Sequence, residues 1–256
     1  MKSEQSSENP KKKKPSPIDE PRPLMGHLAE LRTCLLYSLA AVAACAFAAY
    51  PAVDAVIADL SRPVLAQPGA RLVFISPLEA VFSRIKIALF LGVMLSLPFV
   101  LFQVWSFIQR GLLPKEKRFV FAITLASALL FYTGAFFCYF LILPMGITFL
   151  LAYGSDLLVP MITISRYLSF VLSLIFAFGM IFEVPLAVGF LVKIGLLRSV
   201  DLRRQRKAAI VVMFILAAAL TPGPDVFSQL LMAAPLLVLY EIGIAVAVLI
   251  EKKSKP

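Results

Sequence analysis

The chain has 256 residues, of which 60% are hydrophobic and only 16% are charged, and its mean hydropathy is +0.89. Soluble domains carry about 25% charged residues, so this composition excludes an ordinary soluble globular domain and indicates an integral membrane protein. The formal net charge is +10, and the placement of the basic residues tells more than their number.

The first 23 residues are polar and rich in lysine and proline. They carry too little apolar surface to fold, so we predict a disordered tail over residues 1–23. No long apolar run follows Met1, which argues against a cleavable secretory signal. Residues 24–250 then form the membrane domain, and residues 251–256 form a second tail.

Five apolar segments have about the length that a membrane-spanning helix needs. They are residues 34–50, 87–108, 119–143, 167–192 and 226–250. A further apolar segment, 208–220, would form a helix of only about 20 Å, whereas the hydrocarbon core is about 30 Å thick. Its length alone would suggest a buried or re-entrant helix.

The placement of charge favours a sixth crossing by that short segment. With six spans, most of the 25 Lys and Arg residues fall on one side of the membrane, and the remainder are Arg62, Arg71, Arg84, Lys86 and Arg166. The positive-inside rule then puts both termini in the cytoplasm, whereas five spans would put the Lys-rich tail outside. The sequence therefore predicts an all-α protein of the cell inner membrane with six spans, around whose short fifth span the bilayer is thinned.

The long connection after the first span contains two local signals. PAVDAVIADL, which begins at Pro51, has Val53 and Leu60 on one side of a predicted amphipathic helix. SPLE then predicts the start of the second long helix, with Ser76 as N-cap and Glu79 as the return partner of a capping box. Near the other end of this helix, Trp105 and Phe107 are predicted to anchor it at the membrane interface.

Two carboxylates, Glu183 and Glu241, fall inside predicted spans. An ionisable group at membrane depth is costly and by default faces protein or a water-filled cavity. Pro185 and Pro235 lie in the same two helices and suggest kinks beside these groups. The residues leave two readings open: a protonated glutamate hydrogen-bonded between helices, or a functional glutamate that lines a cavity.

Three more acids lie at the ends of spans. Glu30, one turn before the first span, is explained equally well by the positive end of its helix. Glu116, just before the third span, is explained equally well by ion pairs with its basic neighbours. Asp225, in the outer turn TPGPDVFSQ, is predicted to cap the last span.

Sequence signals for catalysis and cofactors are missing. The chain has no GxxxxGK[ST] phosphate-binding loop, no HExxH pair and no serine elbow. Its single histidine, His27, cannot build a metal site alone, and Cys34 and Cys45 would lie about 16 Å apart on one helix. We therefore expect no enzyme, no metal, no cofactor and no disulfide.

The order of several motifs resembles the TatC family, the multispanning subunit of the twin-arginine protein translocase. The resemblance runs from about residue 24 to residue 250 and rests on HLAELR, SPLEAVF, FQVWSFI, LLFYTGAFFCYF, YLSFV with FAFGMIFEVP, and TPGPDVFSQ with YEIG.

This resemblance implies a receptor for signal peptides with paired arginines and the core of a pore that exports folded proteins with the proton-motive force. Glu30 and Glu116 would hold the two arginines, because each carboxylate can accept a guanidinium bidentately. The family pattern places further residues around that site, namely Arg32, Gln103, Phe107 and Leu112.

The resemblance also implies partners and a setting for the buried acid. Glu183 would face a concave groove within the bilayer, and spans five and six would both be short. Single-span TatA and TatB subunits would pack on the helices, spans five and six above all. Membrane lipid and further copies of the chain would complete the complex, with no nucleic acid.

Thr33 and Cys34 follow Arg32, where the family often has a second basic residue, and Gly111 follows Arg110, where a proline is more common. One alternative needs no family: a secondary transporter of a small cationic solute that uses Glu183 and Glu241. Against it, transporters often show an internal repeat, and none is visible in this sequence.

Overall fold

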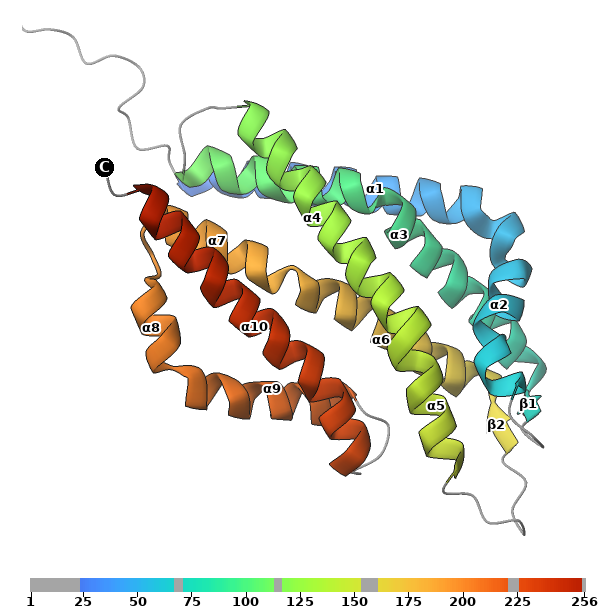
Figure 1. Ribbon diagram of the computed structural model, residues 1–256. Helices are drawn as coiled ribbons and strands as arrows, with labels where there is room; N and C mark the ends of the chain where they lie inside the picture. Colours follow the sequence, from blue (N-terminus) through green and yellow to red (C-terminus); the bar gives the residue numbers. More distant parts are fainter. Residues whose placement is uncertain (1–23, 67–70, 113–116, 153–160, 221–225, 255–256) are drawn as a thin grey trace, which may run out of the picture.

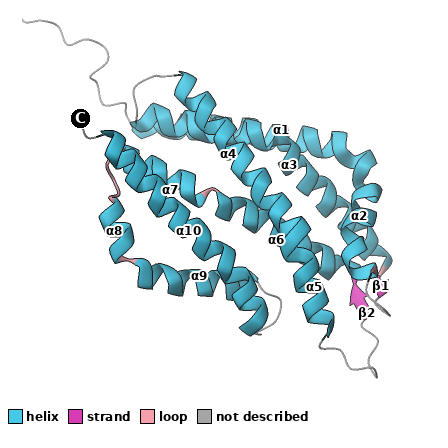
Figure 2. Ribbon diagram, in the orientation of Figure 1, coloured by secondary structure: helices cyan, strands magenta, loops and turns pink. Residues whose placement is uncertain are grey.

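The computed structural model describes residues 24–66, 71–112, 117–152, 161–220 and 226–254. These residues are almost entirely helical, with one small pair of strands (Figure 1, Figure 2). In chain order the elements are α1 (Leu24–Ala49), η1 (Tyr50–Ala52), α2 (Val53–Leu65), β1 (Arg71–Val73), α3 (Pro77–Leu112), α4 (Lys117–Phe137), η2 (Cys138–Ile142), α5 (Leu143–Ala152), β2 (Met161–Thr163), α6 (Ile164–Phe182), α7 (Val184–Lys193), α8 (Ser199–Arg204), α9 (Arg206–Leu220) and α10 (Val226–Ser254).

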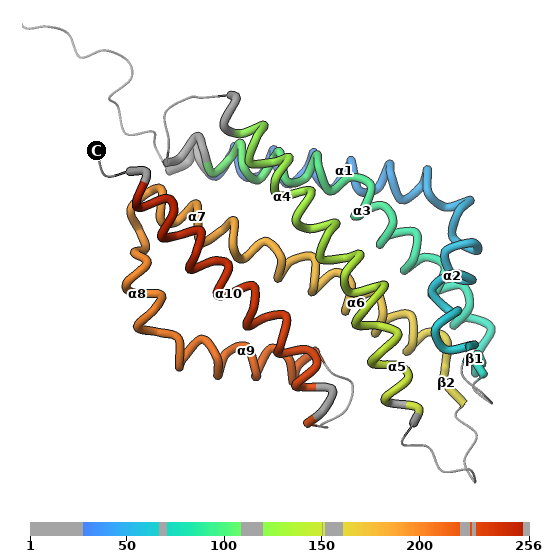
Figure 3. Tube along the Cα trace, in the orientation of Figure 1, coloured from blue at the N-terminus to red at the C-terminus, as the bar shows by residue number. Residues whose placement is uncertain are grey.

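The long helices pack in pairs across the molecule. Helix α1 lies along α3, α4 crosses α6, and α10 packs against α7 and α9 (Figure 1, Figure 3). The all-helical class is confirmed, as expected where the backbone of a spanning segment must satisfy its own hydrogen bonds. The predicted domain bounds at 24 and 250 remain predictions, although the last helix continues to Ser254.

Five stretches are long and apolar enough to cross a membrane among the described residues. They are Leu28–Leu65, Pro77–Ile108, Val120–Phe149, Ile164–Lys193 and Gln229–Lys252. Each contains most or all of one predicted span. Helix α9 has only 15 residues, so the sixth crossing stays a prediction.

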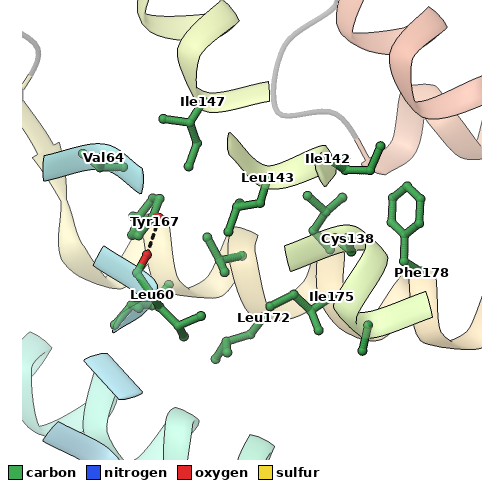
Figure 4. Close-up of a cluster of buried hydrophobic side chains, with 14 of the residues drawn as sticks. Leu60, Val64, Cys138, Ile142, Leu143, Ile147, Tyr167, Leu172, Ile175 and Phe178 are labelled. Carbon is green, nitrogen blue, oxygen red and sulfur yellow. Dashed lines mark hydrogen bonds between the residues drawn. The ribbon is translucent and has the colours of Figure 1, made fainter. Parts of the chain in front are cut away.

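The main apolar core joins the connection after α1 to the helices α5 and α6. Tyr167 is buried there, and its hydroxyl donates a hydrogen bond of 2.6 Å to the carbonyl of Leu60 (Figure 4). Cys138 and Phe178 are fully buried in the same cluster. The predicted amphipathic helix is confirmed as α2, with Val53 and Leu60 buried.

The fourth apolar stretch is broken at Glu183. Helix α6 ends at Phe182 and α7 begins at Val184, with Pro185 in the first turn of α7. Proline has no N–H to continue the helical ladder, so the predicted interruption beside this acid is confirmed. Helix α10, in contrast, runs through Pro235 as one helix.

Glu79 makes more contacts than the predicted capping box requires. Its Oε2 accepts a hydrogen bond of 2.9 Å from the N–H of Ile75, and its carboxylate also interacts with the N–H of Ser76, the predicted N-cap. Its Oε1 accepts one of 3.2 Å from the N–H of Ser165, in the first turn of α6. Glu79 thus ties the starts of α3 and α6 together, next to the parallel pairing of β1 with β2.

Trp105 is not the interfacial anchor that the sequence suggests. It is only 9% exposed, and its ring lies edge-on to Phe190 of α7 with the ring centroids 5.1 Å apart. Val120 and Ile123 of α4 complete this second, smaller core. Trp105 of α3 therefore packs against α4 and α7. Burial of its ring between these helices outweighs the preference of tryptophan for the membrane interface.

Gly134 permits the close crossing of α4 and α6. A Cβ at Gly134 would lie 2.6 Å from the carbonyl oxygen of Phe178, a backbone atom that cannot move aside alone. We expect Gly134→Ala to destabilise the protein by about 1–3 kcal/mol, seen as a lower melting temperature in detergent.

Gly146→Ala is the matched control, because nothing lies within 4 Å of a Cβ at that helical position. This change should leave the melting temperature unchanged or raise it slightly, since alanine favours the helix. Equal effects of the two substitutions would contradict the close crossing.

Candidate functional site

A pocket of about 350 Å³ lies between α1 and α3. It is lined by Ala29, Glu30, Thr33, Cys34, Tyr37 and Gln103. Two of these residues, Glu30 and Gln103, are predicted site residues, and the structure brings them to one cavity although they are far apart in the sequence.

The spacing of the α1 residues explains their common face. Positions 30, 33, 34 and 37 follow the three- and four-residue steps that put side chains on one side of a helix. Gln103 reaches the cavity from α3, which packs closely along α1. A Cβ at Gly92 would lie 2.6 Å from both the Val42 carbonyl oxygen and the Ala46 Cβ, so a larger residue would push the two helices apart.

The lining of the pocket suits a cationic, planar group. Among the described residues that line the pocket, Glu30 alone carries a charge, and Gln103 offers an amide. The hydroxyl of Thr33 bonds within α1, where it donates a hydrogen bond of 2.9 Å to the carbonyl of Ala29. Tyr37 is 60% exposed and provides an aromatic face that can attract a cation.

The other predicted binding residues are placed less completely. Arg32 lies on α1 with an exposed side chain, and Phe107 on α3 is half-buried. Leu112 is the last residue of α3, but its side chain is outside the described part. Glu116 and Asp225 lie outside the described residues, so their roles remain predictions.

Glu183 sits at the break between α6 and α7 and faces α4. The hydroxyl of Ser127 donates a hydrogen bond of 2.6 Å to its Oε2. Its Oε1 and the hydroxyl of Thr124, one turn from Ser127 on α4, are buried without a hydrogen-bond partner among the described residues. The geometry places this glutamate between α4 and the break from α6 to α7, and both readings of its role stay predictions.

Glu241 has a different environment from the one that its place in the sequence suggests. Its side chain is 54% exposed and forms an ion pair of 2.7 Å with Arg206, at the start of α9. The carboxylate is therefore matched by a cation from the neighbouring helix instead of being enclosed in the protein.

Sequence reasoning missed several residues of these sites. Tyr37 could have been found from its spacing, because it lies two helical turns after Glu30 on the same face of the helix. Ser127 and Arg206 had no such signal, because each lies on a different helix from its partner glutamate. Among the residues that the structure describes, no three His, Cys, Asp or Glu side chains form a metal-binding group.

The fold and the comparisons define a multi-span membrane protein of one known architecture. Two solved structures described as the twin-arginine translocase receptor TatC superpose with TM-scores of 0.78 and 0.79, at 39% and 40% identity. They cover 88% and 86% of this chain, and 99% of their own chains.

Comparison with protein families matches residues 26–235 to the family described as Sec-independent protein translocase protein (TatC). Curated relatives of that name are 43% identical in Carboxydothermus hydrogenoformans, over 92% of this chain and 97% of the relative, and 40% identical in Aquifex aeolicus, over 91% and 98%. The relative in Escherichia coli is 36% identical, over 89% of this chain and 88% of its own. The chain belongs to the TatC family, and is a protein-transport component of the cytoplasmic membrane rather than an enzyme.

The contact between Ser127 and Glu183 should be energetically coupled. We expect Ser127→Ala and Glu183→Ala to show a coupling free energy of about 0.5–2 kcal/mol in a double-mutant cycle, the range for hydrogen bonds between membrane helices. Unfolding in detergent measures each variant.

Thr133→Val supplies the control for this cycle. The Thr133 hydroxyl bonds only within α4, to the carbonyl of Leu129, so its effect and that of Glu183→Ala should add. Additive effects for Ser127→Ala as well would mean that the hydrogen bond to Glu183 contributes nothing.

Proposed function

We propose that this chain is the receptor and core subunit of a twin-arginine translocase, and that it binds signal peptides with paired arginines through Glu30 and Glu116. The observation that carries the proposal is the α1–α3 pocket, whose described lining has one charged residue, Glu30, beside polar and aromatic side chains. Family membership supplies the biological setting for this chemistry.

The pocket would discriminate between arginine and lysine by geometry. A guanidinium presents a planar fork of donors that one carboxylate accepts bidentately, whereas an ammonium is a point charge that cannot match that fork. A planar guanidinium can also stack on the exposed ring of Tyr37. One pocket takes one arginine, so the second would fall to Glu116.

The setting of this receptor follows from the charge distribution and the family. Both termini face the cytoplasm, α9 forms a short fifth span, and α10 forms the sixth. The helices then enclose a concave groove with Glu183 on its wall, and Glu183 acts after recognition. Single-span TatA and TatB subunits and further copies of this chain complete the complex, and the proton-motive force drives export.

A crosslinker in the pocket tests recognition directly. We expect a photo-crosslinker at Tyr37 to capture a precursor with an Arg-Arg signal several times more efficiently than its Lys-Lys variant, measured on gels after illumination. A crosslinker at Leu39 is the control, because Leu39 is 64% exposed on the same helix and does not line the pocket. Equal capture of both precursors at Tyr37 would refute the proposed selectivity.

The pair of carboxylates should be required for export. We expect Glu30→Gln with Glu116→Gln to reduce export of an Arg-Arg precursor to background, because a neutral amide cannot hold a guanidinium as a charge-assisted pair. Protease protection of the exported cargo measures transport, and the amount of membrane-inserted protein is checked by immunoblot.

The control removes two exposed carboxylates elsewhere, by Asp54→Asn with Asp201→Asn. It should keep most of the export activity. Export that survives the Glu30 and Glu116 double change would show that the arginine-binding residues lie elsewhere.

A further inference from the structure

Helix α8 and the residues that flank it run alongside α10. At one end Ser199 donates hydrogen bonds from its N–H and its hydroxyl to the carboxylate of Glu251. Further on, the Tyr240 hydroxyl donates to the Leu202 carbonyl at 2.8 Å, and Arg206 pairs with Glu241 at 2.7 Å. These contacts therefore fix the position of the segment along α10, and Figure 1 shows α8 on the side of the C-terminal end of α10.

These contacts show how far along α10 the polar segment extends. A helix rises 1.5 Å per residue, so Glu241 lies about 15 Å further along α10 than Glu251. The candidate span of α10 is Gln229–Lys252, and Glu241 lies near its middle. The charged side chains of α8 therefore extend from the C-terminal end of this candidate span to about its midpoint.

The cations on this segment are exposed. We call Arg198, Arg203, Arg204 and Lys207 the α8 strip, and all four side chains are exposed. The carboxylates that face this segment from its own helix and from α10 are Asp201, Glu241 and Glu251. Arg206 is paired with Glu241, and the strip forms no ion pair with a carboxylate in the part of the chain that the structure describes.

A flat bilayer cannot accommodate the strip. An exposed arginine at the level of the hydrocarbon midpoint costs at least about 2.5 kcal/mol. Arg203 and Arg204 lie in the chain between Leu202, which bonds to Tyr240, and Arg206, which pairs with Glu241. The cost disappears when lipid head groups descend to that level, because the cations then meet phosphate instead of hydrocarbon. Exposed apolar side chains at Leu196 (67%) and Val200 (69%) lie on the same segment, which suits a lipid surface.

We propose that the α8 strip binds the phosphates of anionic phospholipid head groups and holds them about halfway down α10. The basic charge selects the anionic lipid, and the apolar residues among the cations favour a bilayer surface over an acidic protein. The short α9 then crosses a bilayer that these head groups thin from one side. The inference does not depend on which signal peptide the α1–α3 pocket binds.

Lipid binding to the purified protein tests the proposal. Native mass spectrometry measures binding of phosphatidylglycerol and phosphatidylcholine with the same acyl chains to the delipidated full-length protein in detergent. We expect tighter binding of phosphatidylglycerol. Arg203→Gln with Arg204→Gln should weaken it about 30-fold, at roughly fivefold per cation near an anionic surface, without changing phosphatidylcholine binding.

The control variant, Arg71→Gln with Arg166→Gln, removes two exposed cations at the other end of the molecule. It should weaken phosphatidylglycerol binding far less than the strip variant. Equal binding of the two lipids by the wild type, or equal effects of the two variants, would overturn the proposal. So would the strip variant losing a co-purified acidic protein while its lipid binding stays unchanged, because the occupant would then be that protein.

Discussion

The lack of water in the hydrocarbon core of a bilayer is the constraint on which this structure depends. Each backbone and side-chain polar group in that region has to find its partner within the protein. The backbone meets this demand by forming helices, and several side-chain hydroxyls find partners on a neighbouring helix. Tyr132 of α4 donates to the carbonyl of Met94 on α3, and Tyr167 of α6 donates to that of Leu60 on α2.

The places where the helices break follow from the same demand. At Glu183 the helical hydrogen-bond pattern is interrupted. The hydroxyl of Ser127 on α4 donates a hydrogen bond to the carboxylate of Glu183. At the start of α6, Glu79 of α3 accepts a hydrogen bond from the N–H of Ser165. The interruption at Glu183 and the start of α6 are thus each stabilised by a side chain from a helix that lies far away in the sequence.

The molecule also has two unequal halves. Helices α1, α3, α4 and α6 are long, and α3 and α4 contribute to both apolar cores, whereas α9 is short and packs mainly on α10. The pocket with Glu30 lies in the first half and the exposed cations of α8 lie in the second. Membership of the TatC family connects these halves to protein transport, and the proposed peptide site and lipid surface give each half a separate chemical task.

Composition and pattern determined the class of the protein and much of its framework. The apolar lengths predict five helices that could span a membrane, because hydropathy is a local property of the chain. The amphipathic pattern likewise predicts the helix α2, and Pro185 predicts the interruption beside Glu183. The motif order predicts the family and therefore Glu30 and Gln103 as site residues, although no local rule links these two positions.

Only the tertiary structure decided which groups meet. It gave Glu79 a partner at the start of α6, buried Trp105 against Phe190, and paired the exposed Glu241 with Arg206. It also added Tyr37 to the pocket of Glu30 and Ser127 to the surroundings of Glu183. A sequence states how apolar each segment is, but the partner of a polar group depends on the crossing of helices that are distant along the chain.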